Sequence, residues 1–522
     1  MLVLQDRRLL IVPPSATLPL SKIKGVIPHT TTFRFRGHQL AAVPHTEDVT
    51  KVLRNLGLNA PHPIQHYYDW PARFSPFPEQ RTTSAVLASE RRAYCLSGMG
   101  VGKTISTLWA YDFLRTEGLA QCMLVVAPLS TLERTWGDHV FEHFPHLEAR
   151  VLHGAARRRK QLLDSPADVY IVNHHGLATI ASELAKRPDI DLVVYDELAV
   201  CRNAKTQLWK SANAVINQQL NGTRRAWGLT GTPIPNEPTD AWAQCKLITP
   251  TRVPRYFGAF RDSVMKQVSQ FRWVSRPDAL EKVYQLLQPS VRFSLDDCTD
   301  LPEQIFLERD APLTPAQQKA YKAMMDDLRL QAAEGRVLAV NEAVKAGKLL
   351  QIACGVAYTE GGGEALIPVE HRLAALHELV DESEASVIVF VPFTAAIKLV
   401  AEYCRRHWSC EIIDGGVSKR NRDETFKAFQ QGSIKVLVAQ PATMSHGLTL
   451  TAASTIIWYA PINSNETFEQ ANARIRRPGQ TRSTVVACLT GTPIERKMFD
   501  RLKKKQSVQG ALLDLFRNQN KE

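Results

Sequence analysis

The sequence predicts an α/β fold made of two similar lobes, each with a parallel β-sheet covered by helices on both faces. Short runs of Val, Ile and Leu alternate with longer amphipathic stretches, a pattern typical of buried parallel strands joined by crossover helices. The pattern occurs twice, from about Gln80 to Leu247 and from about Ser386 to Thr490. The chain has 522 residues, more than one ordinary hydrophobic core supports. We therefore expect two lobes, with helical insertions between and within them.

Four segments are expected in order along the chain. They are a small module of strands and a helix at 1–65, a first lobe at 66–300 with a helical insertion, a second lobe at 301–505 and a tail at 506–522. Between the two α/β patterns, a charged amphipathic stretch predicts a helix with Thr314 as its N-cap and Gly335 near its end. The glycines at 361–363 predict a turn or loop after it.

Composition narrows the class of protein. The 64 Lys and Arg residues against 52 Asp and Glu give a net charge of +12, which would raise the local concentration of a polyanion such as nucleic acid. The nine cysteines form no C-x-x-C pair, so a zinc ribbon or disulfide framework is not indicated and a reducing compartment fits best. No apolar run approaches the length of a membrane span, and the first residues lack the layout of a cleavable signal. We expect a cytoplasmic protein.

The segment SGMGVGKT, Ser97 to Thr104, follows an apolar strand pattern and precedes a helical one. Its glycines let backbone N–H groups converge on phosphate oxygens at a helix N-terminus, while the lysine supplies positive charge and the threonine hydroxyl can ligate Mg²⁺. A purely structural turn is the alternative, but Gly-Lys-Thr in this setting favours nucleotide binding. The predicted phosphate-binding residues are Ser97, Gly98, Met99, Gly100, Val101, Gly102, Lys103 and Thr104.

A pair of carboxylates supplies the second part of the predicted site. In LVVYDELAV, Leu192 to Tyr195 form a buried strand pattern whose carboxyl end presents Asp196 and Glu197. Asp196 would hold Mg²⁺, and Glu197 would orient and deprotonate the water that attacks the γ-phosphoryl group. Alone, the pair could simply cap the next helix. Together with the phosphate-binding loop it predicts ATP hydrolysis.

The ordered set of motifs resembles the Swi/Snf-type ATPases of helicase superfamily two over about residues 66–510, which implies two RecA-like lobes. PFPEQ with Gln80 resembles the adenine-reading glutamine motif, and LVVAPLSTLERTW and VYIVNHHGL resemble motifs Ia and Ib. GLTGTPIPN is the most specific match. The residues of this motif that the resemblance implies in coupling are Thr230, Gly231 and Thr232.

The second lobe carries motifs IV, V and VI of the same family. SVIVFVPF resembles motif IV, ATMSHGLTLTAASTIIWY motif V and EQANARIRRPGQ motif VI. By this resemblance Gln470 contacts the nucleotide, Arg477 is the arginine finger and Arg474 is its phosphate-facing neighbour. An arginine presented across a cleft neutralises charge that develops during phosphoryl transfer. The alternative is that both arginines lie on a solvated helix face.

This chain departs from the family pattern at several positions. Ala199 stands where relatives usually carry a histidine after Asp-Glu, so the coupling of hydrolysis to movement through that side chain is absent. Ser97 and Gly98 replace a common acidic pair, and Thr449 stands where motif V often has asparagine. None of these changes removes a catalytic atom.

The resemblance also implies loops that contact nucleic-acid phosphates without recognising sequence. The candidate residues are Ser130, Thr131, Asn173, Ser445 and His446. A Ser or Thr in a loop is more often a turn or cap residue, and His174 and His175 are interpreted as structural rather than metal ligands. The basic runs RRRK, KRNR and KKK could add salt-dependent attraction, although solvated helix faces are their default interpretation.

The predicted function is an ATP- and Mg²⁺-dependent motor that acts on duplex, forked or branched DNA in replication, recombination or repair. The compact form is most similar to phage or bacterial members of the family, and we expect a monomer. Residues 1–65 resemble the HARP-like module of annealing helicases, with a plain folded extension as the alternative. An RNA-directed ATPase, a nucleic-acid-binding scaffold with a dead motor, and the motor of a nuclease system are the other hypotheses.

Overall fold

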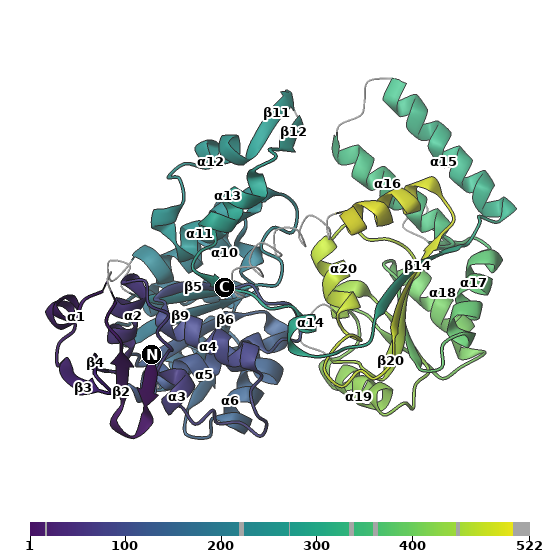
Figure 1. Ribbon diagram of the computed structural model, residues 1–522. Helices are drawn as coiled ribbons and strands as arrows, with labels where there is room; N and C mark the ends of the chain where they lie inside the picture. The colour runs from purple at the N-terminus through teal and green to yellow at the C-terminus, as the bar shows by residue number, and fades with distance from the viewer. Residues whose placement is uncertain are drawn as a thin grey trace. The chain divides into compact units, whose positions relative to one another are not determined.

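The computed structural model describes residues 1–15, 18–218, 224–270, 272–333, 339–358, 364–444 and 449–504. The chain divides into two compact units, and Figure 1 shows the elements of each. Among the described residues, the first unit consists of residues 1–234 and 238–294, and the second consists of residues 235–237 and 295–504. None of the helices in the described ranges is both long and apolar enough to cross a membrane.

The first unit contains a seven-stranded sheet in the order β13-β5-β10-β9-β6-β8-β7. All six pairings are parallel, which confirms the fold predicted for the first lobe. The strands are β5 (Arg92–Cys95), β6 (Cys122–Ala127), β7 (Ala149–Val151), β8 (Val169–Asn173), β9 (Ile190–Asp196), β10 (Arg225–Leu229) and β13 (Ser290–Val291). Because neighbouring strands run the same way, their carboxyl ends lie along one edge of the sheet.

Helices cover this sheet, and side chains of the strands and helices form the hydrophobic core between them. Strands β6, β8 and β10 are buried along their whole length, as expected for strands with helices on both faces. The large side chains of Trp109, Trp136 and Trp227 are fully buried in the core. The helices are α3 (Ile64–Tyr67), α4 (Pro78–Ser89), α5 (Lys103–Thr116), α6 (Asp138–His143), α7 (Ala156–Leu163), α8 (His174–Leu177), α9 (Ala181–Ala185), α10 (Gln207–Asn213), α11 (Ala241–Ile248), α12 (Phe257–Val264) and α13 (Ala279–Leu286). A small hairpin follows α12, with β11 (Met265–Ser269) paired to β12 (Arg272–Ser275).

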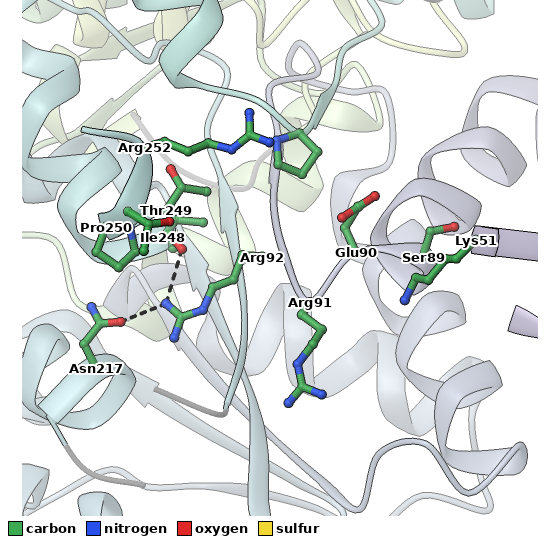
Figure 2. Close-up of a pocket in the computed structure, with 12 residues that line it drawn as sticks. Lys51, Ser89, Glu90, Arg91, Arg92, Asn217, Ile248, Thr249, Pro250 and Arg252 are labelled. Carbon is green, nitrogen blue, oxygen red and sulfur yellow. Dashed lines mark hydrogen bonds between the residues drawn. The ribbon is translucent and has the colours of Figure 1, made fainter. Parts of the chain in front are cut away.

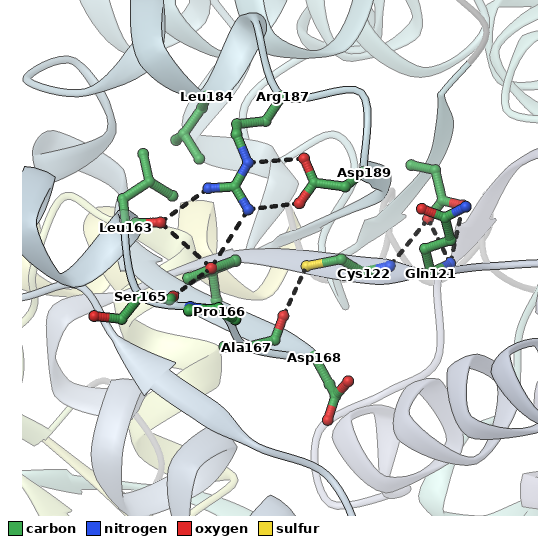
Figure 3. Close-up of polar contacts among 12 residues, drawn as sticks. Gln121, Cys122, Leu163, Ser165, Pro166, Ala167, Asp168, Leu184, Arg187 and Asp189 are labelled. Atoms are coloured by element: carbon green, nitrogen blue, oxygen red, sulfur yellow. Dashed lines mark hydrogen bonds and ion pairs between the residues drawn. The ribbon is translucent and has the colours of Figure 1, made fainter.

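Polar contacts fasten the segments around the amino ends of the central strands (Figure 3). The guanidinium of Arg187 donates to the carboxylate of Asp189 at 2.7 and 2.5 Å and to the Leu163 carbonyl at 2.9 Å. At the start of β6, the Cys122 thiol donates to the Ala167 carbonyl at 3.4 Å. The loops at the amino ends of these strands are therefore held together by hydrogen bonds and an ion pair with a structural role.

A four-stranded antiparallel sheet in the order β1-β2-β4-β3 forms the N-terminal module. Its elements are β1 (Leu2–Leu4), β2 (Leu9–Val12), α1 (Leu20–Val26), β3 (Thr31–Phe35), β4 (His38–Pro44) and α2 (Glu47–Asn55). One face packs on the two helices around a small core that includes Leu10, Val12 and Leu53. The module is joined to the lobe by an Arg8–Glu117 ion pair at 3.0 Å and by an Arg54–Ser89 hydrogen bond at 3.4 Å.

The second unit contains a six-stranded sheet in the order β14-β21-β20-β17-β19-β18, again parallel throughout. The strands are β14 (Gln304–Asp310), β17 (Ser386–Phe390), β18 (Cys410–Ile413), β19 (Val436–Ala439), β20 (Ala453–Trp458) and β21 (Thr484–Thr490). The helices are α14 (Leu295–Cys298), α15 (Pro315–Ala333), α16 (Ala339–Ala353), α17 (Glu370–Asp381), α18 (Thr394–Arg405), α19 (Lys419–Gln430) and α20 (Asn465–Asn472), and a hairpin pairs β15 (Val356–Tyr358) with β16 (Glu364–Leu366). Two parallel sheets with covering helices confirm the predicted α/β architecture.

Thr314 is the N-cap of α15, as predicted. Its hydroxyl accepts the Gln317 N–H at 3.3 Å, and the Gln317 side chain accepts the Thr314 N–H at 3.0 Å. This reciprocal pair satisfies two donors at the start of the helix. Gly335 and the glycines at 361–363 lie outside the described residues.

Candidate nucleotide-binding site

The segment Ser97 to Thr104 forms a loop between the carboxyl end of β5 and the first turn of α5. Gly100 and Gly102 have φ angles of +82° and +89°, a left-handed conformation that glycine adopts without strain. The Lys103 Nζ donates to the carbonyls of Ser97 and Gly98, both at 3.1 Å. The loop therefore brings backbone N–H groups, a helix N-terminus and a cation together, which is the arrangement that binds phosphate.

Ser97, which stands at the first position of the loop, has a structural role. Its hydroxyl accepts the Phe293 N–H at 3.1 Å, and the Phe293 carbonyl accepts the Gly98 N–H at 2.8 Å. These bonds extend the pairing of β5 with β13 into the loop. The serine thus ties the base of the loop to the edge of the sheet.

Gln80, on the first turn of α4, contacts the same loop. Its amide Nε2 donates to the Val101 carbonyl at 3.0 Å, and its Oε1 accepts the Phe77 N–H at 3.0 Å. The side chain is buried and lies directly over Gly102, where a Cβ atom would collide with the amide. The structure therefore brings the predicted adenine-reading residue against the phosphate-binding loop.

Asp196 is the last residue of β9, and Glu197 follows it in a left-handed conformation with φ of +53°. This conformation is strained for a residue with a side chain, and such strain concentrates at functional sites. The Glu197 side chain makes no capping hydrogen bond to the short helix Leu198–Cys201, whereas Asp196 Oδ1 accepts the Glu197 N–H at 3.1 Å. Burial raises the pKa of Asp196, whereas a Trp136 hydrogen bond and the charge of Lys103 lower it.

Two residues that sequence reasoning missed hold Asp196 in place. The Trp136 Nε1 donates to its Oδ2 at 3.0 Å, and His174 Nε2 lies 2.8 Å from its backbone carbonyl. His174 also stacks on Tyr195, with ring centroids 5.1 Å apart, which agrees with the structural interpretation of this histidine. Trp136 follows β6 and His174 follows β8, and both strands lie on the same side of β9 in the sheet. Their proximity to Asp196 follows from the order of the strands in the sheet, which places β6 next to β9 and β8 next to β6.

The residues assigned to coupling follow β10, which lies between β5 and β9. The Thr230 N–H donates to the Cys95 carbonyl at 3.0 Å, and the Thr230 hydroxyl accepts the Thr232 N–H at 3.1 Å. A Cβ atom on Gly231 would lie 3.6 Å from the Ser97 carbonyl and 4.0 Å from the Lys103 Nζ. The three residues therefore border the phosphate-binding loop.

In the second unit, the arginines of motif VI follow α20, because that helix ends at Asn472. They are therefore not on a solvated helix face. Arg474 is only 2% exposed, and Gln470 is also buried. Arg477 is partly exposed, with its Nε donating to the Ala473 carbonyl at 3.2 Å and its Nη1 donating to the Thr449 hydroxyl at 3.4 Å. Burial lowers the pKa of Arg477 to about 10, so this side chain stays charged at neutral pH.

The candidate nucleic-acid contacts differ in their exposure. Ser130 is exposed in the short 3₁₀ helix Leu129–Thr131 after β6, whereas Thr131 is buried and its hydroxyl donates to the Pro128 carbonyl at 3.0 Å. Asn173 is buried at the end of β8, opposite Ala127 in the pairing with β6. Thr131 is thus engaged in the local turn. Ser445 and His446 lie outside the described residues.

One residue in each of the three basic runs forms an ion pair with a nearby glutamate. Lys160 pairs with Glu183, Arg420 with Glu424 at 2.9 Å, and Lys503 with Glu308 at 2.8 Å. These pairs are typical of solvated surfaces.

A pocket of about 700 Å³ lies elsewhere in the first unit, at the amino end of β5 (Figure 2). Its lining includes Lys51, Glu90 and Arg252, but none of the predicted nucleotide-binding residues. The guanidinium of Arg92 in this pocket donates to the Asn217 side chain at 2.8 Å and to the Ile248 carbonyl at 3.2 Å. This pocket is therefore separate from the candidate nucleotide site, which lies at the carboxyl end of β5.

A phosphate-binding loop after β5 and an Asp-Glu pair at the carboxyl end of β9 define a P-loop ATPase, here with a second parallel α/β unit. Residues 91–354 match the SNF2-related domain family, and residues 371–479 match the helicase conserved C-terminal domain. The first match covers half of the chain. The chain belongs to the SNF2-related family and is a helicase-like ATPase of superfamily two.

Known relatives cover most of the chain at low identity. Putative protein p41 of Acyrthosiphon pisum secondary endosymbiont phage 1 is 26% identical, over 85% of this chain and 99% of that protein. The ISWI chromatin-remodeling complex ATPase ISW1 of Saccharomyces cerevisiae is 24% identical, over 78% of this chain and 37% of its own. The ATP-dependent DNA helicase DDM1 of Arabidopsis thaliana is 23% identical, over 80% and 58%. The chain thus spans almost the whole phage protein but under two thirds of these two eukaryotic relatives.

The SWI2/SNF2 ATPase core of Sulfolobus solfataricus, solved in complex with dsDNA, is similar to this chain at 22% identity. The match covers 84% of this chain and 92% of that one, with a TM-score of 0.41.

Proposed function

We propose that this ATPase is a motor that moves along double-stranded DNA and that duplex, forked or branched DNA stimulates its hydrolysis of ATP. The observation that carries the proposal is the assembly of Lys103, Asp196 and Thr230 around one loop in a chain of the SNF2-related family. Two relatives are named as a chromatin-remodeling ATPase and a DNA helicase, which supports DNA rather than RNA as the substrate.

In the proposed mechanism, the residues of the first unit bind and orient the nucleotide. The N–H groups of the loop and the Lys103 ammonium meet the β- and γ-phosphates, which requires the lysine to leave the two carbonyls that it contacts. Glu197 positions the attacking water opposite the bond between the γ-phosphorus and the β–γ bridging oxygen, and it accepts a proton from that water. The water oxygen bonds to the γ-phosphorus as this bond breaks, which gives phosphate and ADP. Gln80 stays beside the loop, where its amide can recognise the adenine.

The Asp196 carboxylate and the Thr104 hydroxyl fit Mg²⁺, because hard oxygen ligands suit this ion. Asp196 is 9% exposed, and the Trp136 bond fixes one of its oxygens. When bound, Mg²⁺ would neutralise charge on the β- and γ-phosphate oxygens. Trp136 and His174 orient the aspartate toward this task.

The second unit is proposed to supply Arg477 as the finger and Gln470 as a nucleotide contact. Arg477 is the more available of the two assigned arginines, since Arg474 is 2% exposed. A guanidinium that reaches the transferred phosphoryl group neutralises charge developing there. Hydrolysis would then depend on both units, which is how a motor converts chemistry into movement.

We further propose a monomer that acts in the cytoplasm of a bacterium, in replication, recombination or repair. The match to 99% of a phage protein supports this setting. Residues 1–65 would recognise the structure of the DNA, and residues 301–505 would form the second motor lobe.

The experiment is the steady-state ATPase rate of the full chain without nucleic acid and with duplex DNA, forked DNA, single-stranded DNA or RNA. Lys103→Ala is the blank, because it removes the cation from the loop. We expect duplex and forked DNA to raise the ATPase rate. In a second assay, the chain should displace the third strand of a DNA triplex only when ATP is present.

The other hypotheses give different results in the same assay. Preferential stimulation by RNA would support an RNA-directed ATPase and contradict the proposal. A chain that binds DNA but shows no hydrolysis above the Lys103→Ala blank would be a scaffold. A full rate in Lys103→Ala would show that the nucleotide site is wrongly assigned.

A further inference from the structure

Two phenylalanines of the N-terminal module are exposed on its edge strand, β3. Phe33 is 38% exposed and Phe35 is 57% exposed. They alternate along the strand, so both lie on the same face of the sheet. Directly opposite on β4 are Leu40 and His38, which share that face. The aromatic rings therefore belong to one continuous surface.

This surface is the face of the sheet turned away from the module's core. The core side is filled by Leu10, Val12, Ala41 and Val43, all essentially fully buried. Residues 31–39 are exposed without exception. In Figure 1, β3 lies at the outer side of the module, and in the sheet it pairs only with β4. Water thus reaches both the rings and the open edge of the strand.

The part of the chain that carries the two rings is basic. Residues 1–40 contain six Lys or Arg and a single acidic residue, Asp6. Arg34, between them in sequence, points to the opposite face of the strand, whereas the Arg36 guanidinium, in the turn after β3, lies 5.4 Å from the centre of the Phe35 ring. Exposed aromatic rings with an arginine beside them suit nucleic acid, because bases stack on the rings and the cation attracts phosphate.

We propose that β3 and the turn after it form a binding surface for single-stranded DNA. Unpaired bases stack on Phe33 and Phe35, while Arg36 contacts the phosphates beside Phe35. A sheet face with exposed aromatic rings is a general means of holding unpaired bases. This site is separate from the motor and depends on the proposed function only for the choice of DNA.

The two rings are two residues apart, about 6.7 Å along an extended strand. That distance is about twice the 3.4 Å step between stacked bases. Each ring can therefore hold one base of a strand that is no longer paired or continuously stacked. A rigid duplex does not present its bases in this way, so the surface selects unpaired strands.

The test measures binding of a fluorescein-labelled 15-nucleotide oligothymidine to the full chain by fluorescence anisotropy. Excess unlabelled duplex is present to occupy the motor. We compare the wild type with the double variant Phe33→Ala, Phe35→Ala, and with Phe141→Ala as the control. Phe141 is an 84% exposed phenylalanine on α6, so the control removes a similar ring from another surface.

We expect the double variant to lose at least about 25-fold in affinity, since stacking contributes at least about fivefold per base. The control should bind as the wild type does, and duplex-stimulated ATPase should be unchanged in both. Equal affinity of the double variant and the wild type would overturn the proposal. So would a loss confined to Arg36→Gln, because binding would then be purely electrostatic.

The outcome also separates this proposal from the proposed motor function. Failure of duplex DNA to stimulate ATPase would contradict the motor, yet ring-dependent oligothymidine binding would still support the surface. A double variant that binds normally but changes the oligomeric state of the chain would assign the surface to a second copy instead.

Discussion

The indole of Trp136 donates a hydrogen bond to the carboxylate of Asp196 at 3.0 Å, although 60 residues separate them in the chain. Trp136 is fully buried and Asp196 is 9% exposed. The bond fixes the orientation of the aspartate and stabilises its charged form, in opposition to the effect of burial. A tryptophan in the interior thus supports the residue proposed to hold Mg²⁺.

Trp136→Phe should raise the Mg²⁺ concentration that gives half-maximal ATPase activity by about tenfold or more. Loss of a group that orients a metal ligand weakens metal affinity on this scale. The measurement is ATPase rate against Mg²⁺ concentration at constant ATP. The matched control is Trp109→Phe, which removes another buried indole N–H, bonded to the Pro71 carbonyl at 2.9 Å. An equal shift in both variants would mean that the effect is general destabilisation.

Gln80→Glu should weaken ATP binding by at least about fivefold. The new carboxylate would face the Val101 carbonyl in place of a donor, and an unmade buried hydrogen bond costs about 1–3 kcal/mol. Titration with a fluorescent ATP analogue measures the change, with the exposed Gln161→Glu as the control for added charge. Unchanged affinity would show that Gln80 does not shape the nucleotide site.

Arg477→Ala should lower the maximal DNA-stimulated ATPase rate by about 10³-fold, the effect expected for loss of an arginine finger. The control is the neighbouring Arg476→Ala, whose side chain pairs with Asp296 at 2.5 Å in the same unit. Because Asp296 is 53% exposed, that pair contributes little to stability. A full rate in Arg477→Ala would eliminate the finger assignment.

The stability of the chain should fall in acid partly through His62. Burial lowers its pKa to about 3, so the folded chain keeps it neutral while the unfolded chain protonates it below about pH 6.5. Its contribution is therefore intact above pH 6.5 and is lost as pH falls toward 3, by about 1.4 kcal/mol per pH unit.

Urea unfolding of the wild type and His62→Gln at pH 7 and pH 5 measures this effect. The variant should show the smaller loss of unfolding free energy between the two pH values. His175→Gln is the control because His175 is exposed. Identical losses in the wild type and His62→Gln would contradict the assignment.

The fold class was predictable because alternating strand and helix patterns are local features of the sequence. The phosphate-binding loop was equally accessible, since Ser97 to Thr104 are contiguous and their spacing expresses their geometry. The positions of Trp136 and His174 were not. They depend on β8, β6 and β9 being neighbours, and the order of strands in a sheet is set by packing between distant segments.

Which arginine of motif VI is accessible was also hidden from the sequence. Helical spacing treats Arg474 and Arg477 as one face, yet the helix ends at Asn472 and the turn that follows buries the first side chain. Ser97 is a similar case. The sequence showed only that Ser97 and Gly98 replace a common acidic pair, and the structure shows that the Ser97 hydroxyl contacts Phe293, 196 residues away.

Helix α4 links the nucleotide site to the N-terminal module. Gln80 near its start donates a hydrogen bond to the Val101 carbonyl of the phosphate-binding loop, and Ser89 at its end accepts a hydrogen bond from Arg54 of the module. Between them, the Ser84 hydroxyl donates to the Ser106 carbonyl of α5 at 2.9 Å. A helix of 12 residues is a rod of about 18 Å whose ends cannot move independently. A displacement of Gln80 on ATP binding would therefore move the whole helix, and with it the hydrogen bond between Ser89 and Arg54 of the N-terminal module.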